Sequence, residues 1–340
     1  MLELSVPLIV KNEENRIKDC LDNLTWAKEV ILVDTGSTDK TLEIAKNYPN
    51  VKIYSNWYNN KFRFRVWFAR KKKWLFCFDK ARNYALSKCT QPYILILDAD
   101  ERIYNPEALN KLMTEHSDID VWYLRQVSRL KDGNGSPCKT TRFWKNGLGI
   151  YYTKMVHETV DEIVDQKGFK RGDCDLEIDH VGFLDEGYNK VKSERVIDAI
   201  EYEGHPYKNY YLGVAYSQVG DWEKSMDYFS KAVQDAMPYN IKAHAHAILA
   251  DIARQYGEFY IGMAEDHVKH SLKNTPNQNL SYIIRSAIKD FKGQNGLREL
   301  KKVKNRNYKT SEMHQDILLT DGQMQSMIKE YDLKREKCTV

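Results

Sequence analysis

Two carboxylates follow an apolar segment in "YILILDADE", and their types and spacing could bind a cation. Asp98 and Asp100 are separated by one residue at the end of the run. In a turn beyond a strand they can converge on one ion. Carboxylate oxygens suit Mg²⁺ or Mn²⁺, and proteins often share such ions with substrate phosphates. A simpler interpretation is that these acids only solvate a turn.

A second polar cluster, "VDTGSTDKT", also follows an apolar run. Asp34 ends that run, and Gly36 gives the backbone the freedom for a tight turn. The carboxylate of Asp34 could accept hydrogen bonds from a nucleobase or a ribose. The cluster could equally cap a helix, with Thr38 or Asp39 near its N-terminus. It is no Walker loop, because the G-x-x-x-x-G-K pattern is absent.

The elements that must position these residues alternate along the first half of the chain. Near-continuous apolar strands that alternate with helices predict an α/β fold, with a mostly parallel sheet covered by helices on both faces. Ligands of such sheets bind beyond the carboxyl ends of the strands, which is where "KNEE", "DTGSTD" and "DADE" fall. The expected strands are 4–10, 29–39, 51–57 and 92–100, and the expected helices are 14–26, 41–49 and 78–89.

Several segments, in this order, resemble the successive motifs of family 2 glycosyltransferases, which have the GT-A (Rossmann-like) fold. They are "PLIVKNEENRIKDCLDNL", "VILVDTGSTDKT", "FDKARNYAL", "YILILDADE", "TRFWKN…KMVHETV" and "DHVGF". The resemblance spans about residues 2–185. It implies an enzyme that moves a sugar from a nucleotide-diphosphate sugar, expected to be a UDP-sugar, to an acceptor, with Mn²⁺ or Mg²⁺ as cofactor.

The resemblance also implies roles for individual residues in binding the donor. Asp34 would bind the uracil or equivalent base, and Arg82 in "ARN" would face the nucleotide. Asp98 and Asp100 would form the D-x-D motif, with Asp100 on the metal that bridges the diphosphate. His180 in "DHVGF" is either a further metal ligand or a structural histidine in a turn. The implied nucleotide-sugar-binding residues are Val10, Asn12, Glu13, Asp34, Arg82 and Asp98.

The acceptor also needs a group that removes its proton. A single displacement inverts the anomeric centre, so the base must lie on the face opposite the leaving group. The resemblance implies that this base is Glu158 in "VHE". His157 could itself be the base, with Glu158 orienting it, and Glu158 could also be a surface acid.

The stretch "KFRFRVWFARKKKWLFCF", residues 61–78, is an insertion relative to the family pattern. Its alternation predicts a hairpin with Phe62, Phe64 and Val66 on one face and cations on the other. Its positive charges could protect a strand edge, bind an anionic membrane or glycolipid, or bind nucleic-acid phosphates. We expect a polyanionic acceptor here. The candidate acceptor-binding residues are Arg63, Arg65, Arg70, Lys71, Lys72 and Lys73.

Beyond the first half, the chain changes character. Residues 120–185 predict strands around the turn "KDGNGSP", and helices are expected after Gly187. The "G-acidic-aromatic" turn at Gly220 returns at Gly257, near the tetratricopeptide period, although an ordinary helical hairpin also fits. We therefore expect a GT-A domain over 1–187 and a helical, tetratricopeptide-like domain with a charged tail over 188–340. Such repeats could bind a protein partner.

Composition narrows the class of protein. The chain has 340 residues and a net charge of only +4, so the basic insertion is a local feature. No apolar run approaches the roughly 18 residues that span a bilayer, and the start is not typical of a signal peptide. The cysteines lack C-x-x-C pairing, which favours reduced thiols. A cytoplasmic protein, either free or peripheral to the inner membrane face, is expected.

Three functions are open on the sequence alone. Within the family, the subgroup with a helical C-terminal extension includes enzymes that build bacterial surface glycans and enzymes that glycosylate bacteriocin peptides. The acceptor is therefore expected to be a surface glycan, a glycolipid or a peptide. A second possibility is glycosylation of modified bases in DNA. A third is a degenerate, non-catalytic GT-A scaffold, although all the expected carboxylates are present.

Overall fold

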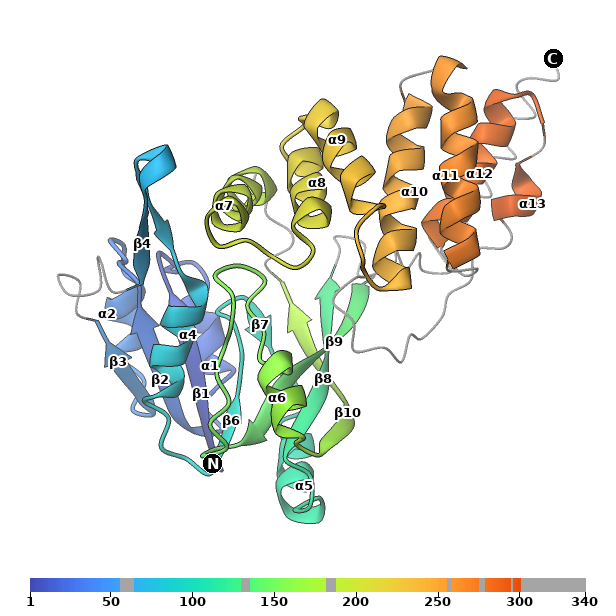
Figure 1. Ribbon diagram of the computed structural model, residues 1–340. Coiled ribbons are helices and arrows are strands. Elements are labelled where there is room, and N and C mark those ends of the chain that lie inside the picture. Colours follow the sequence, from blue (N-terminus) through green and yellow to red (C-terminus); the bar gives the residue numbers. More distant parts are fainter. Residues whose placement is uncertain are drawn as a thin grey trace. The chain divides into compact units, whose positions relative to one another are not determined.

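The computed structural model describes residues 1–55, 64–129, 135–181, 188–255, 258–274, 279–294 and 296–300. The chain divides into two compact units (Figure 1). The first spans Met1–Asp185, and the second begins at Glu186.

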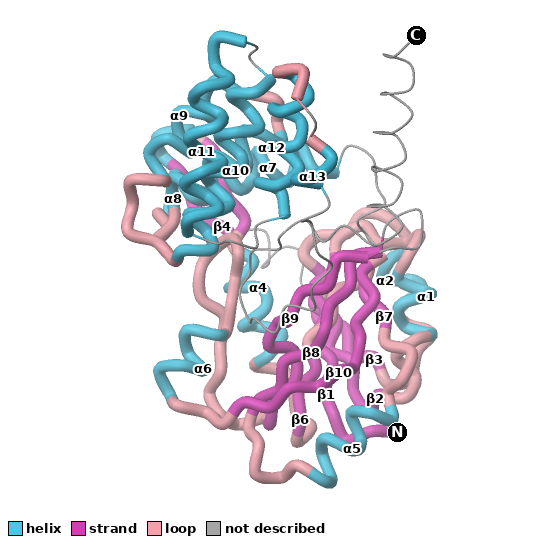
Figure 2. The backbone as a smooth tube through the Cα atoms, turned by 90° about the vertical axis from the view of Figure 1, so that its right-hand side faces the viewer, coloured by secondary structure: helices cyan, strands magenta, loops and turns pink. Residues whose placement is uncertain are grey.

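An eight-stranded sheet organises the first unit (Figure 2), in the order β3-β2-β1-β6-β9-β8-β10-β7. The pairs β1–β2, β2–β3, β1–β6 and β8–β10 are parallel, whereas β9 and β7 pair antiparallel with their neighbours. The α/β prediction with a mostly parallel sheet is therefore confirmed. The strands are β1 (Leu2–Val10), β2 (Ala27–Asp34), β3 (Val51–Tyr54), β6 (Tyr93–Leu95), β7 (Glu101–Arg102), β8 (Val121–Arg129), β9 (Gly135–Lys145) and β10 (Arg171–His180).

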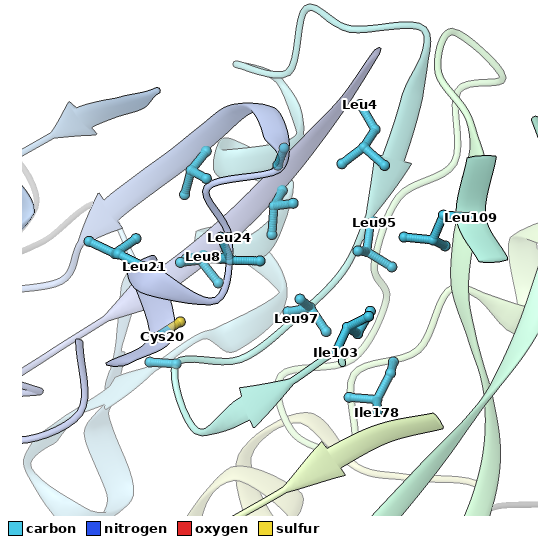
Figure 3. Close-up of a cluster of buried hydrophobic side chains, with 14 of the residues drawn as sticks. Leu4, Leu8, Cys20, Leu21, Leu24, Leu95, Leu97, Ile103, Leu109 and Ile178 are labelled. Carbon is cyan, nitrogen blue, oxygen red and sulfur yellow. The ribbon is translucent and has the colours of Figure 1, made fainter. Parts of the chain in front are cut away.

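Apolar side chains cover both faces of this sheet, as near-continuous apolar strands require. On one face, strand residues such as Leu4 and Leu8 pack with residues of α1, α2 and α5 (Figure 3). On the other face, Ile31 and Val33 pack against Ala81 and Ala85 of α4, and a further cluster includes Val164 of α6. These helices are α1 (Ile17–Asp22), α2 (Thr41–Ala45), α4 (Phe78–Leu86), α5 (Glu107–Glu115) and α6 (Asp161–Lys167).

Two of the expected helices are shorter than the sequence pattern suggested. The helix expected over 14–26 is only Ile17–Asp22, and that expected over 41–49 is only Thr41–Ala45. For the first of these helices, the physical reason lies in the residues before α1. The backbone N–H of Glu13 donates to the hydroxyl of Thr41 in α2, and that of Glu14 donates to the carboxylate of Asp39 in the β2–α2 loop. These two residues therefore form a loop and not the first turn of a helix.

The basic insertion forms an antiparallel hairpin of β4 (Arg65–Phe68) and β5 (Lys73–Phe76), which is a separate two-stranded sheet. A short 3₁₀ turn, Ala69–Lys71, and Lys72 in the left-handed conformation connect the strands. The hairpin prediction is confirmed for these residues. The expected cation Arg63 and the expected apolar residue Phe62 lie outside the described residues.

The second unit is helical, as predicted. Consecutive helices α8 and α9 pack together, as do α10 and α11. Gly220 has a φ of 83°, and the next residue, Asp221, caps α9 by accepting the N–H of Lys224. The helices are α7 (Tyr188–Glu203), α8 (Lys208–Gln218), α9 (Trp222–Ala232), α10 (Tyr239–Gln255), α11 (Ile261–Asn274), α12 (Asn279–Phe291) and α13 (Leu297–Leu300).

In the described parts of the chain, no helix combines the length and the apolar character that crossing a bilayer requires.

Candidate active site

The loops that follow β1 and β2 are bound to each other at the carboxyl edge of the sheet. Asn12 has a φ of 57°, and its side chain accepts the N–H of Thr38 at 2.8 Å. Its own N–H donates to the hydroxyl of Ser37 at 3.0 Å, while the backbone N–H of Thr35 donates to the carbonyl of Val10. These hydrogen bonds join two predicted donor-binding segments, the loop after β1 and the loop after β2, at one edge of the sheet.

Asp34 is the last residue of β2 and is only 2% exposed. One of its oxygens accepts the N–H of Ser37 at 2.9 Å, closing the turn that contains Gly36, whose φ is 115°. Asp39 accepts hydrogen bonds from the N–H and the hydroxyl of Thr41, the first residue of α2. An acid predicted near the N-terminus of this helix therefore does bind its first turn.

The D-x-D segment follows β6 in a tight turn. The N–H of Glu101 donates to the carbonyl of Asp98 at 3.0 Å. The side chain of Glu101, in return, accepts the N–H of Asp98 at 2.8 Å. Glu101 therefore fixes the backbone between the two aspartates from both sides.

Glu101 is buried and binds an arginine below the turn. Arg142 of β9 forms an ion pair with it at 3.0 Å, and the amide of Gln126 donates to it at 2.6 Å. Burial raises the pKa of Glu101, and the charge of Arg142 offsets only part of this effect, since Asp98 and Asp100 act in the opposite direction.

His180 is brought to Asp100 by strand pairing. β10 pairs antiparallel with β7, which places His180 opposite Glu101, and the N–H of Val181 donates to the carbonyl of Asp100. The Nε2 of His180 lies 3.2 Å from Oδ2 of Asp100. Burial lowers the pKa of His180, but the hydrogen bond and charge of Asp100 outweigh it, so the pKa is raised above its usual value.

Arg82 of α4 connects two of the predicted site acids. Its guanidinium lies 2.9 Å from Asp98 and donates to Glu158 at 2.8 Å, and it lies over the ring of Tyr152. Burial alone would raise the pKa of Asp98, but the charges of Arg82 and Arg142 hold it below its usual range. The sequence did not indicate this contact between "ARN" and "VHE".

Glu158 lies on a closed loop that begins and ends with an isolated bridge between Thr153 and Thr159. Within this loop Lys154 and His157 have positive φ values, 71° and 53°, which non-glycine residues rarely adopt. Such backbone conformations persist where the surroundings hold them, and they often occur at functional sites. The loop directs Glu158 to Arg82.

The expected divalent cation would need oxygen or nitrogen donors at this edge of the sheet. Among the described residues, no three His, Cys, Asp or Glu side chains are grouped in a way that could hold a metal. Asp100 and His180 do form a pair of one oxygen and one nitrogen donor. Mg²⁺ and similar ions commonly take only one or two protein carboxylates and complete their shell with water and substrate phosphates. The pair therefore fits an ion that is shared with a bound diphosphate.

Sequence reasoning missed the residues that support the site. Glu101 was seen only as part of "DADE", and Arg142 and Gln126 were not singled out. A charged residue inside an otherwise apolar strand, such as Arg142 beside Phe143 and Trp144, is a signal that could have found the pair, because buried charges need partners.

Comparison with known proteins identifies the first unit. The family model "Glycosyl transferase family 2" matches residues 5–175. The chain belongs to this family, and its first unit is a glycosyltransferase domain.

Individual relatives cover only part of the chain. A lipopolysaccharide core biosynthesis glycosyltransferase, LpsC of Rhizobium meliloti, is 33% identical over 47% of this chain and 57% of its own length. The glycosyltransferase SunS of Bacillus subtilis is 26% identical over 70% of this chain and 54% of its own. The chain thus spans about half the length of these relatives.

Among solved structures, TarS 1–349 of S. aureus in complex with UDP-GlcNAc aligns with a TM-score of 0.41 and 15% identity. The alignment covers 86% of this chain and 93% of the TarS chain.

Proposed function

We propose that the protein is an inverting glycosyltransferase that uses a UDP-sugar and a divalent cation. The observation that carries this proposal is the convergence of Asp98, Asp100, Arg82, Glu158 and His180 at one edge of the sheet, from separate segments of the chain. Membership of the glycosyltransferase family supports the reaction class.

The donor would bind across the carboxyl ends of β1, β2 and β6. Asp34 and the bound loops around Asn12 would hold the nucleoside, with Val10 and Glu13 beside them. Asp100 and His180 would hold Mn²⁺ or Mg²⁺, which when bound offsets the charge that develops on a leaving diphosphate. Burial raises the pKa of Glu13, although the charge of Arg16 opposes this.

Glu158 would remove the acceptor proton. Its ion pair with Arg82 fixes the carboxylate in place, and Arg82 in turn is fixed by Asp98, so the proposed base and the proposed donor site are linked through one guanidinium. His157, the neighbouring residue on the same strained loop, remains the alternative base.

The acceptor would be a hydroxyl of a bacterial surface glycan or glycolipid. Similarity to a glycosyltransferase of lipopolysaccharide core biosynthesis favours this class. A peptide acceptor or a modified DNA base are the alternatives within the same chemistry. The helical unit could bind a protein partner.

Donor specificity and metal use can be tested directly. We would measure UDP binding by titration calorimetry with and without Mn²⁺, and then screen hydrolysis of UDP-, GDP- and dTDP-sugars. Metal-dependent UDP binding with slow hydrolysis of a UDP-sugar is the expected result. A non-catalytic scaffold would show no metal-dependent nucleotide binding, and the Asp100→Ala variant provides the matched control.

A further inference from the structure

The β4–β5 hairpin is a surface feature that the proposed catalytic residues do not explain. At its base, Phe64 is buried against Ile31, Val33 and helix α4, and the N–H of Cys77 donates to the carbonyl of Phe64. From this base the hairpin extends past the sheet edge at which β1 and β2 end (Figure 1). It is therefore a projection rooted in the core beside the candidate site.

One face of the hairpin exposes two tryptophans. Trp67 and Trp74 lie opposite each other in the strand register, and each is 46% exposed. Their ring centroids are 5.5 Å apart, with the planes tilted by 59°. The other face carries Phe68 and Leu75, each less than 9% exposed, together with the exposed Lys73 opposite Phe68. The expected division is confirmed for Phe64 and Val66 on one face and Arg65 on the other, and the outer face carries these two rings in addition.

The tip of the hairpin is cationic. Arg70, Lys71, Lys72 and Lys73 are consecutive and exposed. The charged groups of Arg70 and Lys71 lie over the ring of Phe68 at 5.3 and 5.9 Å. Lysines that only protect a strand edge need no exposed tryptophans beside them, and a soluble surface gains nothing from leaving large apolar rings in water.

Tryptophan pairs and basic clusters occur together on proteins that touch membranes. Tryptophan is enriched at the level of the lipid headgroups, and each Lys or Arg near an anionic leaflet adds to binding. Nucleic-acid binders instead present open aromatic faces on which successive bases stack. Here the rings of Trp67 and Trp74 pack against each other. Each ring therefore exposes only the side that faces away from its partner, and the pair presents no open aromatic face on which a base could stack.

We propose that the β4–β5 hairpin docks on a membrane surface that contains anionic lipids. Trp67 and Trp74 enter the interface, and Arg70, Lys71, Lys72 and Lys73 contact the lipid phosphates. The docking itself does not depend on the proposed activity. Its consequence does rest on the proposed function: a site beside this hairpin meets an acceptor that is held in a membrane.

The test is sedimentation of the full chain with vesicles, at low and at high salt. Vesicles of phosphatidylcholine alone are compared with vesicles that also contain phosphatidylglycerol. We expect binding to the second kind only, weakened by salt. Replacing Arg70, Lys71, Lys72 and Lys73 with Ser should weaken this partitioning by several hundredfold, from roughly fivefold for each of the four charges.

Matched variants distinguish docking through the hairpin from a nonspecific attraction between the protein's positive charge and the vesicles. Replacing the exposed lysines Lys28, Lys46, Lys111 and Lys170 with Ser removes the same charge and should leave vesicle binding nearly unchanged. Trp67→Ser with Trp74→Ser should weaken binding and remove a vesicle-induced shift in tryptophan fluorescence, whereas Tyr104→Ser should do neither. Equal loss in the two charge variants would overturn the proposal.

Two further outcomes are decisive. No binding of the native protein to phosphatidylglycerol vesicles at low salt refutes the docking. Binding to single-stranded DNA but not to vesicles, lost in the hairpin charge variant, assigns the surface to nucleic acid instead. Hydrolysis of the UDP-sugar is measured in the same variants, and because it tests the candidate site alone, failure of the docking and failure of the proposed function are distinguishable.

Discussion

Two buried glutamates, at opposite ends of the same sheet, have opposite electrostatic surroundings. Glu29 lies near the start of β2 and Glu101 beyond the end of β6, and they are 2% and 1% exposed. Glu29 accepts hydrogen bonds from the hydroxyls of Ser5 and Thr90 and pairs with Lys52. Although burial alone would raise its pKa, these contacts lower it to about 2.

Glu101 has a comparable set of donors but a raised pKa. The difference is that Asp98 and Asp100 stand beside it, and like charges disfavour the ionised form. At the amino end of the sheet the carboxylate is neutralised and serves stability. At the carboxyl end of the sheet, the acidic side chains carry more negative charge than Arg82 and Arg142 neutralise. A cationic ligand binds favourably at such a site.

The comparison predicts its largest effect at Asp100. Asp100→Ala removes one of the two proposed metal ligands, so transfer should fall by on the order of 10³-fold or more. The fold should persist, because fewer like charges then surround Glu101. Thermal unfolding and sugar transfer are measured together. Near-normal turnover would show that the acid-rich edge does not hold the ion.

The next effect concerns the proposed base. Glu158→Gln keeps an acceptor for Arg82 but cannot take a proton, so the rate should fall by about 10²–10⁴-fold with donor affinity almost unchanged. Asp165→Asn, a nearby exposed acid, is the control. If His157→Ala abolishes transfer and Glu158→Gln does not, the base is His157.

Exchanging each buried glutamate for glutamine compares the two ends of the sheet directly. Glu29→Gln should cost roughly 2–3 kcal/mol in the free energy of unfolding, the value of its lowered pKa, and leave donor binding intact. Glu101→Gln should cost less, because the fold disfavours the ionised form of Glu101 and Arg142 keeps the charge of Asp98 nearby. It should also weaken metal-dependent UDP binding, because Glu101 holds the D-x-D turn. Equal donor affinity in the two variants would contradict the assigned difference.

The sequence predicted the arrangement of the fold because its signals were local. Apolar runs, polar turns and motif order sufficed for the sheet, the hairpin and the helical unit. It placed the site acids at one edge, but the pairing of Arg82 with Glu158 depends on contacts between residues 76 positions apart. Likewise, the exposed faces of Trp67 and Trp74 follow from which side of the hairpin is buried, which alternation alone leaves open.

The smallest expected effect is a difference in acid stability between the sheet and the helical unit. Burial lowers the pKa of His244 and of His246 to about 4, and His246 lies 3.0 Å from His267. Lys242 and His270 add to the lowering at His246. The folded unit therefore keeps these imidazoles neutral.

The sign of the pH effect follows from proton binding. Below the usual histidine pKa of about 6.5 the unfolded chain binds protons that the folded unit does not, so stability falls from pH 6.5 to about 4 and then levels off. The contribution of Glu29 to the free energy of unfolding is lost at lower pH, because it disappears only as the pH falls from about 4.5 towards 2. Hydrogen exchange should therefore show α10 and α11 losing protection between pH 6.5 and 4 while β1 and β2 keep theirs. His246→Leu with His267→Leu should reduce that loss by roughly 2–3 kcal/mol, because the pKa of His246 is displaced as far as that of Glu29. Unchanged exchange in α10 would contradict the assignment.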